Sequence, residues 1–380
     1  SHMKMLVLGG GLQGSACSYD LLKQDDVEKV TLADVRADAS APFLPADPRL
    51  ERVVLDFSDE TATRILMEAH DVVMSAAPYF FNGTLARLAI EAGCDYTDLG
   101  GNTEILFGQL ELSDAAQAAG STLIPDVGLA PGMVNVLAAE GIRRLDQATE
   151  VKMYVGGLPQ NPVPPLNYQV VYSLKGMIDY YSTPSFVIRD GKPVEVDALS
   201  ESENVEFDTL GTLEAFHTAG GASLLPWHYE GKVDRLEYKT LRFPGHAEIM
   251  RSIRDLGLMS LDPVKVGDVS VVPRDVFVAV LRPLLTRSDP DQVVLRVTAT
   301  GTLNGEKVTH RWDLLDKEDE EVGITAMERT TGYTLSLVGL LMGRDIIDAT
   351  GVMPPDEGIP VEIYLTEMAK RGINIRYSRS

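Results

Sequence analysis

The feature that most constrains the fold is a glycine-rich loop near the start of the chain, placed between an apolar run and a helical pattern. Met5–Leu8 is apolar, and the motif Gly9-Gly-Gly11-Leu-Gln-Gly14 follows it directly. A helical pattern over Leu12–Leu22 leads to a second strand-like run, Lys29–Ala33, which ends at Asp34. In dinucleotide-binding βαβ units the glycines allow a tight turn, close approach to a pyrophosphate and close helix–strand packing. The stretch therefore predicts a Rossmann unit; the alternative is a glycine-rich turn in another α/β protein.

Asp34 bears on the choice between the two nicotinamide cofactors. A carboxylate at the end of the second strand accepts hydrogen bonds from ribose hydroxyls and repels a 2′-phosphate. The residue therefore favours NAD, although Arg36, two positions further on, could pair with the 2′-phosphate of NADP. The amides and the dipole at the start of the helix would hold the phosphates. The residues expected at the cofactor are Gly9, Gly11, Leu12, Gln13, Gly14, Asp34, Ser75, Ala76, Ala77 and Gly100.

The first 125 residues alternate short strands with helical patterns, which is typical of a mostly parallel, doubly wound α/β sheet. Strands are expected at Met5–Gly9, Lys29–Asp34, Arg52–Asp56, Asp71–Ser75, Asp95–Asp98 and Thr122–Pro125. Helices are expected at Leu12–Lys23, Asp59–Ala69, Asn82–Gly93 and Glu104–Ala119. Ligands of such sheets bind beyond the carboxyl ends of the strands. We therefore expect residues 75–78, 98–101 and 126–132 to face the cofactor.

From about residue 130 the pattern changes to strand-like segments separated by turns rich in Gly, Pro and Asp. Strands are expected at Glu150–Gly156, Phe186–Arg189, Val233–Arg242, Val276–Leu281, Gln292–Leu303 and Lys307–Leu315. Helices are expected at Met133–Leu145 and Met327–Gly343, and the proline-rich residues 156–165 are expected to form an irregular loop. This part of the chain predicts a second, α+β domain with a largely antiparallel sheet.

The composition argues against several classes of protein. A net charge of −22 over 380 residues provides no basic footprint for nucleic acid. No apolar run approaches the roughly 20 residues that cross a bilayer, and no signal-peptide pattern is present. Cys17 and Cys94, the two cysteines, supply neither a disulfide framework nor a zinc site. We therefore expect a cytoplasmic protein without metal, membrane or nucleic-acid partners.

Further blocks of sequence occur in a recognisable order over nearly the whole chain. They are Asp98–Gly101, Ile124–Met133, Leu213–Gly221, Glu237–Glu248, Thr330–Tyr333 and Gly351–Pro355. Together with the glycine motif they resemble the saccharopine dehydrogenase (saccharopine reductase-like) family, most closely its lysine 6-dehydrogenase branch. His246, after Pro-Gly, resembles lysine 6-dehydrogenase, whereas the reductases that act on saccharopine often carry an aromatic residue there. One departure is that Asp356 precedes Glu357, where the family often has Glu directly after Pro-Pro.

The resemblance implies an NAD-binding Rossmann domain over residues 3–130, completed by C-terminal elements at about 327–380. It implies a substrate-binding and dimerisation α+β domain over residues 131–326, and a homodimer or an assembly of dimers. The implied reaction is NAD-dependent oxidation of the ε-amine of L-lysine to 2-aminoadipate 6-semialdehyde, which cyclises to piperideine-6-carboxylate, with release of ammonia. Two alternatives stay open: an NAD- or NADP-linked enzyme of saccharopine or carboxynorspermidine formation, and a non-catalytic NAD-sensing protein.

Oxidation of an amine requires a proton acceptor, and we expect it among Asp98, Asp126, His217 and His246. The two aspartates follow strands that should face the crevice, where a carboxylate can bind an ammonium group or act as a base. Histidine exchanges protons near neutral pH. The alternative for each aspartate is capping of a turn or helix, and for each histidine it is a structural role.

A second requirement is an anchor for the substrate's carboxylate. Arg242 and Lys239 are the candidates, and Arg242 is preferred because a guanidinium group binds a carboxylate through two parallel hydrogen bonds. Tyr238 shares the strand face of Arg242, whereas Lys239 faces the other side. Tyr79 and Met133 are expected near the nicotinamide.

Overall fold

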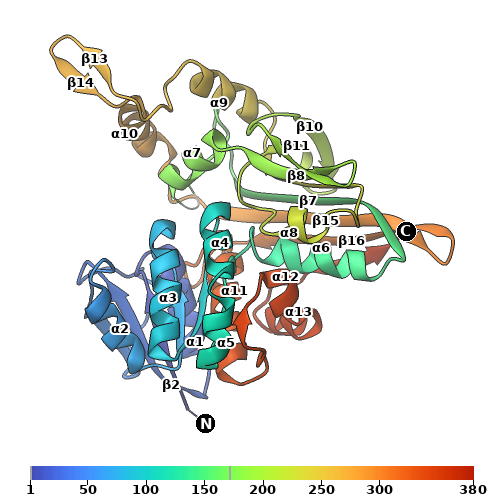
Figure 1. Ribbon diagram of the computed structural model, residues 1–380. Helices are drawn as coiled ribbons and strands as arrows, with labels where there is room; N and C mark the ends of the chain where they lie inside the picture. Colours follow the sequence, from blue (N-terminus) through green and yellow to red (C-terminus); the bar gives the residue numbers. More distant parts are fainter. Residues whose placement is uncertain (1, 171–172) are drawn as a thin grey trace.

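Two β-sheets organise the chain in the computed structural model, which describes residues 2–170 and 173–380 (Figure 1). The first sheet has seven parallel strands in the order β17-β6-β5-β4-β1-β2-β3. They are β1 (Met3–Leu8), β2 (Val27–Asp34), β3 (Leu50–Val54), β4 (Val72–Ser75), β5 (Asp95–Asp98), β6 (Thr122–Ile124) and β17 (Gly351–Val352). This order reverses direction between β1 and β4, so the predicted doubly wound sheet is confirmed.

Helices cover both faces of this sheet (Figure 1). They are α1 (Leu12–Leu22), α2 (Glu60–Glu68), α3 (Asn82–Ala92), α4 (Thr103–Leu110), α5 (Ser113–Ala119) and α11 (Ala326–Gly343), with a 3-10 turn at Tyr79–Phe81. The single helix expected over 104–119 is two helices, and the break at residues 111–112 carries no glycine or proline that would indicate it. Gly332 lets α11 approach α1, because a Cβ there would lie 2.6 Å from that of Ala16.

The second sheet has nine strands in the order β10-β11-β12-β7-β15-β16-β18, with β8 and β9 beside β12. They are β7 (Gln147–Pro159), β8 (Ser185–Arg189), β9 (Lys192–Val196), β10 (Glu203–Phe207), β11 (Gly211–His217), β12 (Arg235–Arg242), β15 (Asp291–Leu303), β16 (Glu306–Lys317) and β18 (Arg376–Arg379). The β12–β7 pair is parallel, and every other described pair in this sheet is antiparallel. The prediction of a largely antiparallel second sheet is confirmed.

Shorter elements surround this sheet and connect it to the first. They are α6 (Met133–Arg143), α7 (Leu174–Ser182), α8 (Leu225–His228), α9 (His246–Asp255), the hairpin β13 (Val264–Val266) and β14 (Val269–Val271), α10 (Pro273–Leu285), α12 (Pro355–Gly358) and α13 (Val361–Lys370). The largest apolar cluster extends from β1 and α1 through α11 and α6 to β7 and β15. No helix of the described residues is both long enough and apolar enough to cross a membrane.

Two further local predictions are wrong. Val276–Leu281, expected as a strand, lies inside helix α10. Its β-branched residues favour a strand, but Pro273 occupies the first helical turn, where proline is preferred, and the buried Phe277, Leu281 and Leu285 recur every four residues. Residues 156–159 of the expected loop belong to β7, where Gly156 lies against the backbone of the neighbouring strand.

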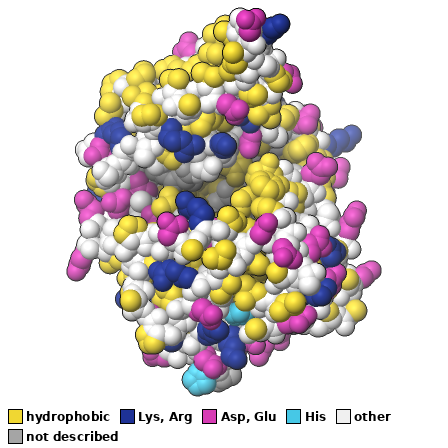
Figure 2. All heavy atoms as spheres, turned by 90° about the vertical axis from the view of Figure 1, so that its left-hand side faces the viewer, with side chains coloured by type: hydrophobic (Ala, Val, Ile, Leu, Met, Phe, Trp, Pro, Cys, Tyr) yellow, Lys and Arg dark blue, Asp and Glu magenta, His cyan; other side chains and the backbone are white. Residues whose placement is uncertain are grey.

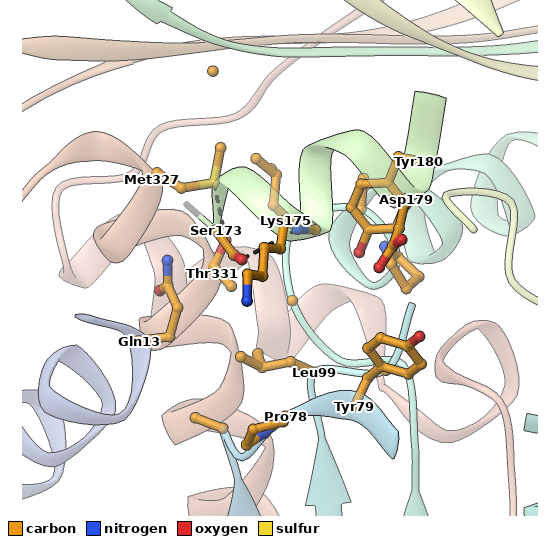
Figure 3. Close-up of a pocket in the computed structure, with 18 of the residues that line it drawn as sticks. Gln13, Pro78, Tyr79, Leu99, Ser173, Lys175, Asp179, Tyr180, Met327 and Thr331 are labelled. Atoms are coloured by element: carbon orange, nitrogen blue, oxygen red, sulfur yellow. Dashed lines mark hydrogen bonds between the residues drawn. The ribbon is translucent and has the colours of Figure 1, made fainter. Parts of the chain in front are cut away.

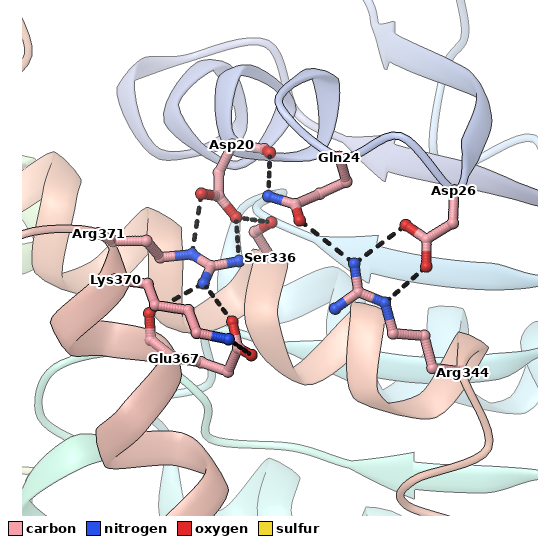
Figure 4. Close-up of polar contacts among 8 residues, drawn as sticks. All are labelled: Asp20, Gln24, Asp26, Ser336, Arg344, Glu367, Lys370 and Arg371. Atoms are coloured by element: carbon pink, nitrogen blue, oxygen red, sulfur yellow. Dashed lines mark hydrogen bonds and ion pairs between the residues drawn. The ribbon is translucent and has the colours of Figure 1, made fainter.

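The end of the chain is tied to the first helix by a buried ion pair, and a more exposed ion pair lies near it (Figure 4). Arg371 donates from Nε and Nη2 to the two carboxylate oxygens of Asp20, at 2.9 and 3.1 Å. Ser336 donates to the same carboxylate, and Arg344 pairs with Asp26. These contacts hold α11 and the turn after α13 against α1, the helix that begins at the glycine motif.

Candidate active site

A cavity of about 780 Å³ lies between the carboxyl ends of the first sheet and one face of the second. Its walls come from the glycine loop and the loops after β4 and β5 on one side, and from β7, β12 and α7 on the other. Figure 2 shows the molecule hollowed on the face where these parts meet. The position is the one at which parallel α/β sheets bind ligands.

The glycine loop forms one end of this cavity. Gly9, Gly11, Gln13, Asp34 and Arg36 line it. Asp34 accepts hydrogen bonds from the amides of residues 10 and 36, at 2.7 and 3.1 Å, and so fixes the loop to the end of β2. No side chain caps the start of α1. Its first amides therefore suit a phosphate group, as a dinucleotide-binding loop requires.

Steric contacts support the same assignment. A Cβ at Gly14 would lie 1.7 Å from the carbonyl oxygen of Gly9, and one at Gly9 would lie 2.6 Å from that of Ala76. Gly9 also has a φ of +99°, which glycine adopts without strain. A Cβ at Gly11 would meet no protein atom within 4 Å, so this position leaves room for a ligand. The residues present fit a dinucleotide.

Seven of the ten residues expected at the cofactor line the cavity: Gly9, Gly11, Gln13, Asp34, Ala76, Ala77 and Gly100. The other three lie elsewhere. Gly14 packs behind the loop, and Leu12 is half exposed at the start of α1. Ser75 is fully buried and donates its hydroxyl to Asn82.

Asp98 lies behind the cavity wall rather than on it. Its side chain is fully buried and accepts hydrogen bonds from the Tyr96 hydroxyl, the Gln109 amide and the backbone N–H of Asp126, at 2.8, 2.8 and 3.0 Å. Burial raises the pKa of this carboxyl group. Asp98 thus holds the loops after β5 and β6 together, and this position gives it no direct contact with a ligand in the cavity.

Asp126 lies one layer behind the wall at Gly100, where a Cβ would come within 1.8 Å of its Oδ1. The carboxylate accepts hydrogen bonds from the amide of Gly101 and, at 2.6 Å, from the hydroxyl of Ser223. Burial, with the neighbouring charge of Asp98, raises the pKa of Asp126 to about 7. It joins the first sheet's loops to the second domain, and its catalytic role stays a prediction.

His246 lies behind Arg242 rather than on the described wall. Its Nδ1 is 3.0 Å from the carbonyl oxygen of Leu166, which can only accept, so Nδ1 carries the proton and Nε2 accepts from the Tyr181 hydroxyl at 2.8 Å. Burial, with the nearby charge of Arg242, lowers the pKa of His246 to about 3. Tyr181 in turn accepts from Arg242 Nε at 3.3 Å. His246 therefore orients the tyrosine and the arginine from this position.

His217 and Lys239 lie on the opposite side of the second sheet from the cavity. His217 Nε2 is 3.4 Å from a carboxylate oxygen of Glu201, and burial lowers the pKa of this histidine. Lys239 donates from Nζ to the backbone carbonyl of Glu201 at 2.8 Å. The structure therefore corrects the expectation that these two side chains reach the substrate. Alternation along a strand explains the placement, since Lys239 lies between two residues that face the cavity.

Tyr238, Thr240 and Arg242 line the cavity from β12, and Tyr79 lines it from the opposite wall. Arg242 is 3% exposed. Its guanidinium carbon lies 4.6 Å from the centre of the Tyr168 ring, and its Nη1 donates to the backbone carbonyl of residue 241. Met133, expected near the nicotinamide, is instead fully buried in the core at the start of α6.

Helix α7 supplies residues that the sequence reasoning missed: Ser173 at its N-cap, Lys175, Asp179 and Tyr180. Figure 3 shows Lys175, Asp179 and Tyr180 on one wall of the cavity, opposite Tyr79 and Leu99. Asp179 accepts from Arg274 Nη1 at 2.5 Å. Two signals could have indicated this helix. The first is the helical spacing of the buried residues Leu174, Met177, Ile178 and Tyr181. The second is the serine at the N-cap, whose hydroxyl accepts a hydrogen bond from the backbone N–H of residue 176.

Comparison with known proteins agrees with this geometry. Residues 5–124 match the family model of the saccharopine dehydrogenase NADP binding domain, and residues 128–373 match that of the saccharopine dehydrogenase C-terminal domain. Saccharopine dehydrogenase [NADP(+), L-glutamate-forming] of Schizosaccharomyces pombe is 24% identical over 264 residues, which cover 67% of this chain and 58% of that protein. The chain therefore spans little more than half the length of this curated relative.

Two solved structures share the fold. Apo saccharopine dehydrogenase (L-Glu forming) from Saccharomyces cerevisiae has a TM-score of 0.82 at 20% identity, with 100% of each chain covered. Homospermidine synthase from Legionella pneumophila, in complex with NAD, has a TM-score of 0.65 at 12% identity, with 100% of this chain and 91% of that chain covered. At these identities the likeness shows the architecture alone.

Proposed function

Because the chain belongs to the saccharopine dehydrogenase family, we propose that it is an NAD-dependent dehydrogenase that oxidises the ε-carbon–nitrogen bond of L-lysine. The observation that carries the proposal is that Arg242 shares one cavity with the glycine loop and Asp34. A carboxylate held by the arginine would lie in the same cavity as the nicotinamide end of a dinucleotide. Such positioning of two reactants supplies much of the rate enhancement in hydride transfer.

The number of basic side chains that line the cavity favours a substrate amino acid with a single carboxylate. The described lining carries Arg36, Lys175 and Arg242. Arg36 lies two residues after Asp34, at the cofactor end of the cavity, and Lys175 is exposed. Arg242 is therefore the buried anchor for the substrate's carboxylate. L-Lysine presents one carboxylate, whereas saccharopine presents three.

Asp179 is our candidate to receive the ammonium end. It is the one carboxylate besides Asp34 among the described lining residues. A bound nicotinamide would accept hydride from the carbon that bears the nitrogen. The protein's part is to hold the ammonium group, to take one proton from it and to admit water. The net reaction converts lysine, NAD and water into the aldehyde, ammonium, NADH and one proton.

The choice of NAD rests on Asp34. Its carboxylate lies at the end of β2, where the ribose hydroxyls of a dinucleotide bind, and a 2′-phosphate there would face a negative charge. Arg36 on the same wall is the residue that an NADP enzyme would use. The matched family model is named for NADP, so the preference requires a direct test.

Saccharopine oxidation is the second candidate, because Lys175 could hold a further carboxylate and the fungal relative carries that name. One assay separates the two: reduction of NAD or NADP, followed by absorbance at mildly alkaline pH, with L-lysine or saccharopine. We expect NADH and ammonia with lysine. Turnover of saccharopine alone would replace the first proposal by the second, and no turnover with either would overturn both. Arg242→Gln should raise the KM for the amino acid and leave NADH binding unchanged.

A further inference from the structure

A second group of ionisable side chains lies on the side of the second sheet that faces away from the cavity. It consists of Glu201, His217 and Glu237, and we call it the histidine cluster. His217 ends β11, Glu237 lies on β12, and Glu201 is in the loop before β10 (Figure 1). One nitrogen of the histidine and one oxygen of each carboxylate lie within 4.8 Å of one another. The three side chains therefore form a single group, separate from the candidate active site.

The strand register brings His217 and Glu237 together. His217 pairs with Lys239 across the antiparallel β11–β12 pair. Glu237 lies two residues before Lys239, so these side chains share one face of the sheet. The loop that carries Glu201 is fixed to the same place, because Lys239 Nζ donates to the Glu201 carbonyl and the amide of Leu199 donates to the carbonyl of His217, each at 2.8 Å. The fold thus assembles the cluster from three separate segments.

Two members of the cluster are buried and carry polar atoms without hydrogen-bond partners. His217 is 0% exposed, and neither of its ring nitrogens has a partner among the described residues. Glu237 is 2% exposed, and its Oε2 has no partner in that part of the chain. His217 Nε2 lies 3.4 Å from Glu201 Oε1 and 4.0 Å from Glu237 Oε2. Buried polar atoms are nearly always paired, so these atoms point to a bound cation.

The donor atoms indicate which cation the cluster suits. One imidazole nitrogen with two carboxylate oxygens is a set that zinc accepts, whereas Mg²⁺ and Ca²⁺ prefer oxygen alone. In a zinc tetrahedron with bonds of about 2.1 Å the ligand atoms lie roughly 3.4 Å apart, a spacing that the cluster approaches. Burial, with the nearby charge of Lys239, lowers the pKa of His217. The imidazole is therefore neutral, which is the form that binds a metal ion.

The basic side chains around the cluster are either engaged elsewhere or open to water. Lys239 is hydrogen-bonded to a backbone carbonyl, and Arg189 donates to the carboxylate of Glu201. Arg235 Nη2 lies 3.7 Å from Glu237 Oε2. The side chains of Arg189 and Arg235 are 30% and 47% exposed, so water and salt screen their charges. Arg189 also holds a carboxylate of the cluster in place, as groups behind metal ligands commonly do.

We infer that the histidine cluster binds a zinc ion through His217 Nε2, Glu201 Oε1 and Glu237 Oε2. Three protein ligands leave the fourth position to water. The ion would tie the loop before β10 to β11 and β12, and the other face of β12 carries Tyr238 and Arg242 of the cavity wall. Zinc would therefore stabilise that wall without touching a substrate. The expectation of a protein without metal rested on its cysteines, whereas these ligands are nitrogen and oxygen atoms.

Isothermal titration calorimetry of the full chain with zinc chloride, after a chelator has removed any metal, tests the inference without substrate. The wild-type protein should bind one zinc ion, and Co²⁺ in its place should give the visible absorption of a four-coordinate site. His217→Gln and Glu237→Gln should each weaken zinc binding at least about 100-fold, because loss of a group that merely orients a ligand already costs about 10–100-fold. His228→Gln is the matched control and should leave zinc binding unchanged. The two ring nitrogens of His228 are already engaged by Asp356 and Glu357, at 2.7 and 3.0 Å.

A wild-type protein that binds no zinc at micromolar concentration, or zinc binding that survives His217→Gln, would overturn the inference. So would binding that is lost in His228→Gln. Circular dichroism checks that the variants are folded; if His217→Gln is not, Glu201→Gln, at a side chain 40% exposed, replaces it. Excess zinc should also raise the Tm of the wild-type protein and of the control, but not that of the cluster variant. An equal rise in all three proteins contradicts the inference, and lysine turnover does not bear on the result.

Discussion

The ion pair between Arg371 and Asp20 is expected to contribute more to stability than any surface pair near it. The side chains of Arg371 and Asp20 are 8% and 5% exposed, and both carboxylate oxygens accept from the guanidinium group. In Arg371→Ala the aspartate would keep one hydrogen-bond donor, Ser336. Removing one partner of a buried pair costs about 3–5 kcal/mol, because the other charge stays buried without compensation. At about 2 °C per kcal/mol for a chain of this size, Tm falls by roughly 6–10 °C.

Lys370→Ala, at the adjacent residue that ends α13, is the matched control. Lys370 pairs with Glu367 at 3.0 Å, but its side chain is 64% exposed. An exposed pair contributes about 0–1 kcal/mol, so Tm should fall by no more than about 2 °C. Differential scanning fluorimetry and urea titration of both variants give the two numbers. Equal losses of stability in Arg371→Ala and Lys370→Ala would refute the reasoning. So would a double variant Arg371→Ala/Asp20→Ala whose loss of stability exceeds the sum of the losses in the two single variants.

Two further changes test the site, and a third tests an ion pair outside it. Asp34→Ala should lower the ratio of kcat/KM with NAD to that with NADP at least about tenfold, a change of ~1.4 kcal/mol; an unchanged ratio contradicts the role of this carboxylate. His246→Ala should raise the KM for lysine and leave that for 1,5-diaminopentane, which lacks the carboxylate, unaltered, because the histidine acts through Tyr181 on Arg242; equal effects on both amines would argue for a general structural loss. The hydrogen bond that His228 donates to the carboxylate of Asp356 raises the pKa of the histidine, so the stabilisation it provides is complete below pH ~6.5 and is lost as pH rises through the folded-state pKa. Thermal unfolding of wild type and His228→Gln should therefore converge at alkaline pH, and a constant difference in Tm would exclude this linkage.

The first sheet was predictable because its signals are local. A glycine motif, short apolar strands and helices between them constrain the topology, and the first six strands lie within a few residues of the expected positions. Helix α10 was mispredicted because its valines favour a strand when taken alone. Two features favour the helix. The proline in its first turn is a local signal, whereas the burial of its apolar side chains against the domain depends on residues far along the chain.

The candidate site was predicted less well, because the orientation of a side chain depends on distant partners. Asp98 and Asp126 do follow strands, as expected, but Gln109 and Ser223 draw their carboxylates away from the cavity. Neither contact has a signature in the sequence around the aspartates. The alternation of side chains between the two faces of β12, in contrast, can be read from the local sequence, and it places Arg242 and Lys239 on opposite faces.

Arg242 is held before any substrate binds, and this bears on how the cavity could discriminate among amines. Its Nε is hydrogen-bonded to Tyr181, its Nη1 to a backbone carbonyl, and its guanidinium carbon lies over the Tyr168 ring. Because His246 orients Tyr181 and is in turn held by a backbone carbonyl, the direction of the guanidinium group is set by the fold. A fixed anchor loses little entropy on binding and fixes the distance from carboxylate to reacting carbon. Chain length should then be the property that the cavity selects, so an amine one methylene shorter than lysine should lose kcat as well as affinity.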